Sequence, residues 1–98
     1  MLKKTYSKTQ KLCRVTFKFN PESPVNSVAL CGEFNEWRSD RHILKKRKDG
    51  SFSTTITLPV NQSFRFKYLI DGNDWFIDPQ ADSEEINCFG SKDSVIHV

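Results

Sequence analysis

Long apolar segments are missing from the sequence. No apolar run approaches the ~20 residues that an α-helix needs to span a bilayer, and the basic first residues include no apolar stretch of the secretory type. The three cysteines are odd in number and have no framework spacing, which argues against a disulfide scaffold and for a reducing compartment. We therefore expect a cytoplasmic protein without a membrane partner.

The residue patterns of common catalytic and metal sites are also missing. The two histidines and three cysteines show no CxxC or HxxxH spacing, and the chain has no GxSxG, P-loop or GxGxxG motif. A carboxylate pair for glycoside hydrolysis is compatible with the sequence. A single thin domain of 98 residues nevertheless offers little depth for a catalytic cleft. We expect no enzymatic activity, no cofactor and no metal ion.

Charge of each sign is gathered in blocks, and the formal net charge of +3 is their remainder. Residues 1–20 carry six basic residues and no acid, residues 38–48 carry six against one acid, and residues 71–93 carry seven acids against one lysine. The basic blocks fit a polyanion-binding surface, or solvated loops and edge strands protected by lysine. We favour the second interpretation and expect no nucleic-acid partner, because no nucleic-acid-binding motif accompanies the charge. The acidic block is most simply a solvated loop.

Short runs of alternating apolar and polar residues dominate the chain, and this pattern is typical of an all-β sandwich or barrel. The expected strands cover residues 13–19, 28–32, 52–58, 64–70, 75–77 and 94–98. In the strongest of them, Arg65, Lys67 and Leu69 point outward and the intervening apolar residues point inward.

The connections between these strands are short, which favours antiparallel pairing. The longest irregular segment, residues 33–49, has Ile43 and Leu44 as its expected core anchor. We predict an immunoglobulin-like sandwich of two antiparallel sheets over residues 13–98, preceded by a basic N-terminal extension over residues 1–12.

A few aromatic residues are badly placed for a core. Trp37 lies in a charged loop, Trp75 follows a turn, and Phe89 precedes Gly90 in the last loop. Exposed aromatic rings beside a long donor such as Lys67 fit sugar recognition, because the C–H face of a pyranose stacks on an indole and its hydroxyls need directional partners. Alternatively, both tryptophans close the ends of the sandwich as partly buried lids.

Two motifs resemble a known family. The segment 30–37, LCGEFNEW, resembles the L-x-G-x-F-N-x-W signature of carbohydrate-binding module family 48. The segment 66–75, FKYLIDGNDW, resembles the Y-K-F-x-V-D-G-x-W signature with one extra residue in the turn. Asp78-Pro79 and the segment 89–96 match in order. This family includes the glycogen-binding domain of the AMP-activated protein kinase β subunit and the early-set domains of isoamylases and branching enzymes.

The resemblance implies an early-set β-sandwich that binds α-1,4-linked glucan without catalysis. It also implies that Trp37 and Trp75 clasp the glucan and that Lys67 bonds to its hydroxyls. The positions that match the family's C-terminal loop contacts are Phe89, Ser91 and Asp93, which replace leucine, threonine and asparagine. The same resemblance places Phe34 in the core and gives Asn35 to the loop backbone.

The function predicted from these residues is non-catalytic binding of glycogen, starch or maltooligosaccharide, with a glycogen-metabolising enzyme as a candidate partner in trans. One alternative is a protein-interaction or regulatory sandwich with a degenerate sugar site. Another is polyanion binding by the basic blocks.

Overall fold

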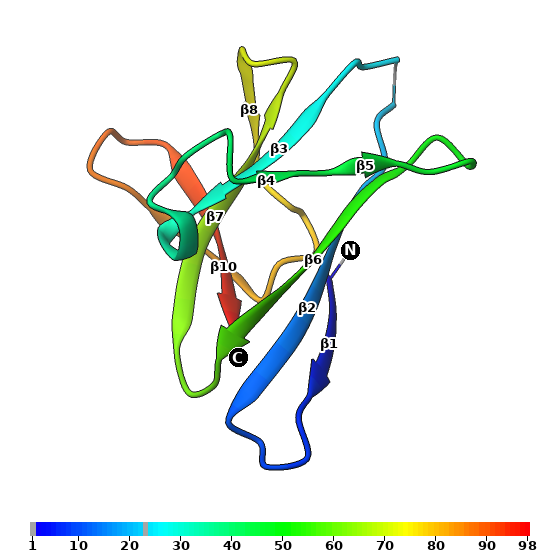
Figure 1. Cartoon of the computed structure of the whole chain (residues 1–98). Coiled ribbons are helices and arrows are strands. Elements are labelled where there is room, and N and C mark those ends of the chain that lie inside the picture. The colour runs from blue at the N-terminus through cyan, green and yellow to red at the C-terminus, as the bar shows by residue number, and fades with distance from the viewer. Residues whose placement is uncertain (1, 23) are drawn as a thin grey trace.

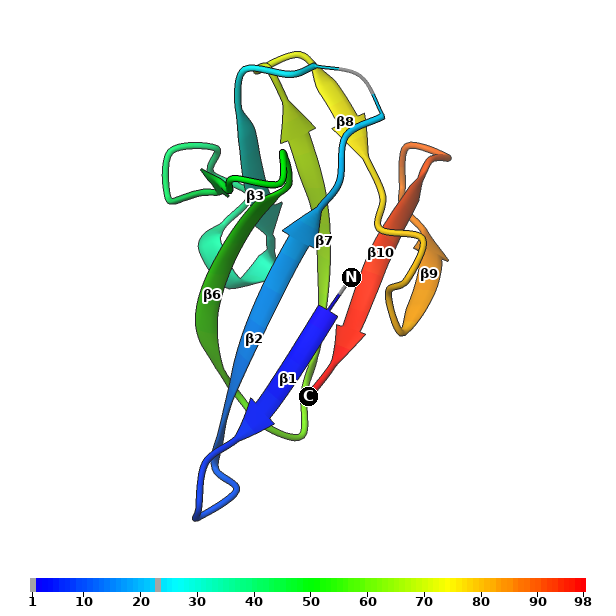
Figure 2. The ribbon, with the colours of Figure 1, turned by 90° about the vertical axis from the view of Figure 1, so that its right-hand side faces the viewer.

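The computed structural model describes residues 2–22 and 24–98, which form two antiparallel sheets packed face to face (Figures 1 and 2). One sheet, here called sheet A, has the order β1-β2-β6-β5. Its strands are β1 (Leu2–Tyr6), β2 (Leu12–Phe19), β6 (Phe52–Pro59) and β5 (Lys45–Lys46). The predicted all-β sandwich of two antiparallel sheets is therefore confirmed.

The second sheet, sheet B, has the order β4-β3-β7-β10-β9, and β8 also pairs with β7. Its strands are β4 (His42–Ile43), β3 (Val28–Gly32), β7 (Ser63–Ile70), β8 (Asp74–Phe76), β9 (Ser83–Ile86) and β10 (Lys92–His97). A short 3-10 helix, η1 (Glu33–Asn35), follows β3 directly.

The core lies between the sheets because strands with one apolar face can bury that face only against each other. On β2, Val15 and Phe17 are fully buried, and on β7 Phe66 and Tyr68 meet them from the other side. The Phe17 and Phe66 rings pack edge to face with centroids 5.1 Å apart. The inward and outward residues of β7 are those that the alternating pattern predicts.

Strand β7 changes partner partway along one of its edges. Residues 63–66 pair with β10, and residues 68–70 pair with β8. Lys67 lies at the junction of these two pairings and points to the outer face of sheet B, as does its partner Cys31 on β3. A long side chain at this junction can therefore reach groups on either neighbouring strand.

Several elements differ from the sequence-based expectation. Residues 2–6 form β1 along β2, and the Lys4 ammonium bonds to Asp82, in the segment that precedes β9, at 2.7 Å. Residues 83–86 form β9 within the acidic block. Leu44 is buried as expected, but the prediction that Ile43 anchors the core is wrong, because its side chain faces outward and is exposed.

The interpretation of the acidic block as a solvated loop is wrong at Asp78, which is buried. Its carboxylate accepts a hydrogen bond from the Tyr68 hydroxyl at 2.9 Å, and its backbone N–H donates to Ser94 Oγ at 2.6 Å. Burial, reinforced by the charge of Asp78, raises the pKa of Tyr68 well above its usual range. The tyrosine is therefore a neutral donor that ties β7 to the segment between β8 and β9.

No helix in the described ranges has the length and apolar character to cross a membrane. The three cysteines are free thiols: Cys13 and Cys31 are buried, and Cys88 is exposed.

Candidate functional site

A tight turn after β3 presents Trp37 at the outer face of sheet B. At Gly32 a Cβ atom would lie 2.6 Å from the Arg65 carbonyl oxygen and 2.9 Å from Phe66 Cβ, so only glycine fits against β7. Phe34 packs on the core beside Phe17, with ring centroids 5.9 Å apart. This confirms the expected core position of Phe34.

Asn35 fixes the same turn from inside. Its side-chain oxygen accepts from the Gly32 N–H at 3.0 Å, and its amide donates to the Leu30 carbonyl at 2.8 Å. The amide also lies 2.9 Å from His42 Nδ1, which accepts because its partner is a donor. The expected bonding of Asn35 to loop backbone is confirmed.

Burial, with a smaller contribution from the charge of Arg41, lowers the pKa of His42. The neutral imidazole is the form that can accept from Asn35, so the lowered pKa favours the hydrogen-bonded turn.

The two residues that follow η1 have left-handed backbone conformations, with φ of 58° at Glu36 and 60° at Trp37. Such conformations cost non-glycine residues on the order of 1–3 kcal/mol each and persist only where surrounding bonds hold them. Here the Trp37 N–H donates to the Gly32 carbonyl at 2.9 Å, closing the turn. The indole is thus displayed by backbone geometry.

Trp75 reaches the same face from β8. It pairs with Leu69 on β7, an outward residue, whereas its neighbour Phe76 points to the opposite face and lies near Phe19, with ring centroids 6.1 Å apart. Trp37 is 37% exposed and Trp75 is 51% exposed, so both indoles lie outside the core.

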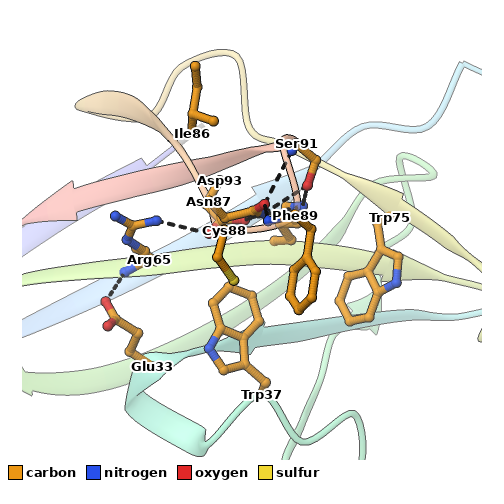
Figure 3. Close-up of a pocket in the computed structure, with 11 residues that line it drawn as sticks. Glu33, Trp37, Arg65, Trp75, Ile86, Asn87, Cys88, Phe89, Ser91 and Asp93 are labelled. Atoms are coloured by element: carbon orange, nitrogen blue, oxygen red, sulfur yellow. Dashed lines mark hydrogen bonds and ion pairs between the residues drawn. The ribbon is translucent and has the colours of Figure 1, made fainter.

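These side chains border a groove of about 690 Å³ on the outer face of sheet B. All six residues predicted for the site line it: Trp37, Lys67, Trp75, Phe89, Ser91 and Asp93. Figure 3 shows the Phe89 ring projecting from its loop between the indoles of Trp37 and Trp75. Phe89 is 89% exposed, so three aromatic faces from separate parts of the chain are open to a ligand.

The floor of the groove is polar, and its charges are paired with one another. Lys67 Nζ lies 3.2 Å from Asp93 Oδ1 and 3.3 Å from Ser91 Oγ. Arg65 binds Glu85 at 2.7 Å and approaches Asp93 at 3.5 Å. The floor therefore offers hydrogen-bonding groups without a large charge of one sign.

Asp93 differs from the other predicted contacts because it is buried. Its carboxylate accepts from Lys67, Arg65 and Asn87. The carboxylate is therefore occupied by protein donors, and its interactions orient the neighbouring side chains.

Sequence reasoning did not select five of the residues that line the groove: Glu33, Arg65, Ile86, Asn87 and Cys88. Glu33 accepts a hydrogen bond from the Arg65 backbone N–H at 2.7 Å, a contact between distant segments that no local pattern predicts. Asn87 had a signal, since an asparagine shortly before a glycine is a common turn residue.

Two carboxylates are among the residues that line the groove. The carboxylates of Glu33 and Asp93 are both engaged by protein donors. Within residues 2–22 and 24–98, no cluster of His, Cys, Asp and Glu could hold a metal ion.

Comparison with known protein families gives one match over most of the chain. Residues 13–98 match the family described as the glycogen recognition site of AMP-activated protein kinase. A search of curated proteins finds no match. The matched range includes both sheets apart from β1 and the first residue of β2, and it includes every residue that lines the groove. The chain therefore belongs to the family of glycogen recognition domains that is typified by AMP-activated protein kinase.

Proposed function

We propose that the groove on sheet B binds α-1,4-linked glucan non-covalently and without catalysis. The observation that carries the proposal is the convergence of Trp37, Trp75 and Phe89 (Figure 3) on one groove that Lys67 also lines. Each pyranose ring has an apolar C–H face that stacks on aromatic rings, and a rim of hydroxyls that needs donors and acceptors. The groove supplies both.

The pairing of charges in the floor favours an uncharged ligand. Lys67 has three ammonium protons, and Asp93 and Ser91 account for two of its contacts. A proton therefore remains for a sugar hydroxyl. Because Arg65 is also held by carboxylates, a polyanion would have to break existing ion pairs before it gained new ones.

The affinity of one shallow groove should lie between roughly micromolar and millimolar, because a single glucan segment buries little surface. We propose that such weak binding places the protein on a glycogen particle, with a glycogen-metabolising enzyme as a partner in trans. The three free thiols support a reducing compartment such as the cytoplasm.

A titration with maltoheptaose, followed by tryptophan fluorescence and calorimetry, tests the proposal. We expect a saturable change that requires an at least ~10-fold higher maltoheptaose concentration in Trp75→Ala and that cellohexaose, the β-1,4-linked control, does not produce. A wild-type protein that gives no response up to ~10 mM maltoheptaose, well above the expected affinity, contradicts it.

Cys88 provides an independent readout, because it lines the groove and is exposed, whereas the other two cysteines are buried. Bound glucan should slow its reaction with a thiol reagent such as 5,5′-dithiobis(2-nitrobenzoate). Unchanged kinetics at a maltoheptaose concentration that saturates the fluorescence signal would place the sugar elsewhere on the molecule.

The second candidate function is protein binding through the same face. Ile86 and Phe89 both line the groove and are 70% and 89% exposed, and exposed apolar side chains suit a protein contact as well as a sugar. A partner protein that is captured equally well in saturating maltoheptaose, while the sugar response is absent, would favour this candidate.

A further inference from the structure

The loop between β9 and β10, residues 87–91, is organised by one side chain. The Asn87 side-chain oxygen accepts from the backbone N–H groups of Phe89, at 2.9 Å, and Ser91, at 3.2 Å. Its amide donates to Ser91 Oγ at 2.7 Å and to Asp93 Oδ1 at 3.0 Å. The side-chain amide thus has four hydrogen bonds, part of which Figure 3 shows at the centre of the groove.

The position of Phe89 depends on this organisation. Its ring is 89% exposed and has no place in the core, so packing does not fix it. The direction of the ring follows from the loop backbone, which Asn87 closes from within and which turns at Gly90, where φ is +82°. Without the Asn87 side chain, the loop would keep the backbone bonds of residue 87 to Ser91 and Gly90 and lose its internal anchor.

The position of Lys67 depends on the same side chain. The Asn87 amide and the Lys67 ammonium share two acceptors, Ser91 Oγ and Asp93 Oδ1. Because Asn87 holds these two oxygens in place from the loop, it also sets the position at which the Lys67 ammonium binds them from β7. Asn87 therefore links an aromatic contact on a loop to a donor on β7.

We propose that Asn87 is the positioning residue of the groove, which holds Phe89 and Lys67 in the arrangement that glucan binds. The inference rests on the proposed function for its ligand, and on the four hydrogen bonds for its mechanism. Binding then costs less, because a loop and a lysine side chain that are already ordered lose little further freedom. Ordering one flexible side chain typically costs ~0.5–1.5 kcal/mol, so removing this anchor should weaken binding ~2- to 12-fold.

Two substitutions separate the halves of the Asn87 side chain. Asn87→Ala removes all four hydrogen bonds, whereas Asn87→Asp keeps an oxygen that can accept from Phe89 and Ser91, loses the donor and turns a second carboxylate oxygen toward Asp93. We expect the alanine variant to bind glucan ~10-fold more weakly in amylose affinity electrophoresis, and the aspartate variant to lie between it and the wild type. Asn26→Ala, at an exposed asparagine in the loop before β3, is the matched control and should bind as the wild type does.

Two double-mutant cycles, with Phe89→Ala and with Lys67→Ala, decide whether Asn87 acts through these residues or touches the sugar itself. If it acts through Phe89, Asn87→Ala in a Phe89→Ala background should cost at most ~3-fold, because much of its effect is already lost. The same ~10-fold loss in the wild type, in the Phe89→Ala background and in the Lys67→Ala background would overturn the positioning role and indicate an independent contact.

A measurement without ligand separates this inference from the proposed function. Amide hydrogen exchange at Phe89 and Ser91 should be faster in Asn87→Ala than in the wild type and near the wild-type rate in Asn87→Asp. Unchanged exchange in the alanine variant overturns the positioning role whether or not glucan binds. Conversely, faster exchange in Asn87→Ala, together with a wild-type protein that amylose does not retard, supports the loop anchor and contradicts the proposed function.

Discussion

The outer faces of the two sheets are built from different residues. On sheet A, the register aligns outward lysines and arginine with hydroxyls, in rows such as Lys3–Thr16–Thr55 and Lys18–Ser53–Lys45. On sheet B, the outward residues include Arg65, Lys67, Leu69 and Trp75. The carboxylates that pair with Arg65 and Lys67 lie on β9 and β10. The face of sheet B also has the turn after β3 and the loop between β9 and β10, which bring Trp37 and Phe89 to the groove.

The two outer faces also differ in how closely their cations are paired with carboxylates. The cations of the groove, Arg65 and Lys67, both bind carboxylates. The basic blocks of the sequence meet on sheet A, where β5 joins β6 beside β2, and there hydroxyls separate the cations and Lys18 lies 3.7 Å from Asp49. Lysines on the edge strands of sheet A, β1 and β5, oppose edge-to-edge pairing, whereas a face with closely paired charges and open rings suits a neutral ligand.

The substitution with the largest expected effect disrupts the packing of β3 against β7, which supports the groove. Gly32→Ala places a methyl group 2.6 Å from the Arg65 carbonyl oxygen, which is backbone and cannot move aside cheaply. We expect a loss of ~3 kcal/mol or more in the free energy of unfolding, or failure to fold. Thermal denaturation measures it, with Ala29→Gly on the same strand as a comparison for the effect of strand propensity. A Gly32→Ala protein of wild-type stability would contradict the close approach of β3 to β7.

The next effect removes ligand binding and leaves the fold. Trp37→Ala and Trp75→Ala should each weaken maltoheptaose binding ~10-fold or more, equivalent to ~1.4 kcal/mol, because each removes a stacking face. Arg14→Ala on the outer face of sheet A is the matched control and should leave the affinity within about twofold, the scatter expected for a surface change. Equal losses for Arg14→Ala and Trp75→Ala in calorimetry would show that the two faces are not functionally distinct.

A smaller effect concerns pH. Because the pKa of His42 in the folded protein is lowered below its ordinary value of 6.5, the unfolded chain binds the proton more readily. The contribution of neutral His42 to the free energy of unfolding is complete above pH 6.5 and is lost as the pH falls from there through the lowered pKa. Urea unfolding on either side of pH 6.5 should show this loss.

His42→Gln should flatten that pH profile, since an amide oxygen can accept from Asn35 at every pH in the range. The same substitution should not affect any further loss of stability below pH 3.8. The carboxyls of Asp40 and Asp82 titrate in that range, because their pKa values are lowered from 3.8.

The smallest effect is expected on sheet A. The hydroxyls of Thr16 and Thr55 lie 2.9 Å apart on its exposed face. Thr55→Val removes this contact and should change the free energy of unfolding by no more than ~0.5 kcal/mol, as is usual for surface substitutions. Glucan affinity should not change. A large change in affinity would extend the functional surface to the opposite sheet.

The sequence allowed the parity of β7, the core position of Phe34 and the sandwich itself to be predicted, because each follows from local alternation or from the first motif. It did not reveal that Asp78 and Asp93 are buried, since their donors come from residues distant along the chain, Tyr68 and Lys67. The pairing of β1 with β2 was not predicted, because the two lysines of β1 obscure the alternation of apolar and polar residues that is typical of a strand.

The convergence of the six predicted residues on one groove could be anticipated only through the family resemblance. No periodicity relates Trp37, Trp75 and Phe89, which reach the groove from a turn, a short strand and a loop. The hydrogen bonds of Asn87 are specific to this loop and were visible only in three dimensions.

The exposure of Phe89 bears on how such a domain can diversify. A ring that has no part in the core can be exchanged for another side chain at little cost in folding. Asn87, beneath it, keeps the loop in shape whatever residue the tip carries. The loop thus separates the requirements of folding from those of recognition, and this position is where directed evolution should find altered ligand preference with the fewest unfolded variants.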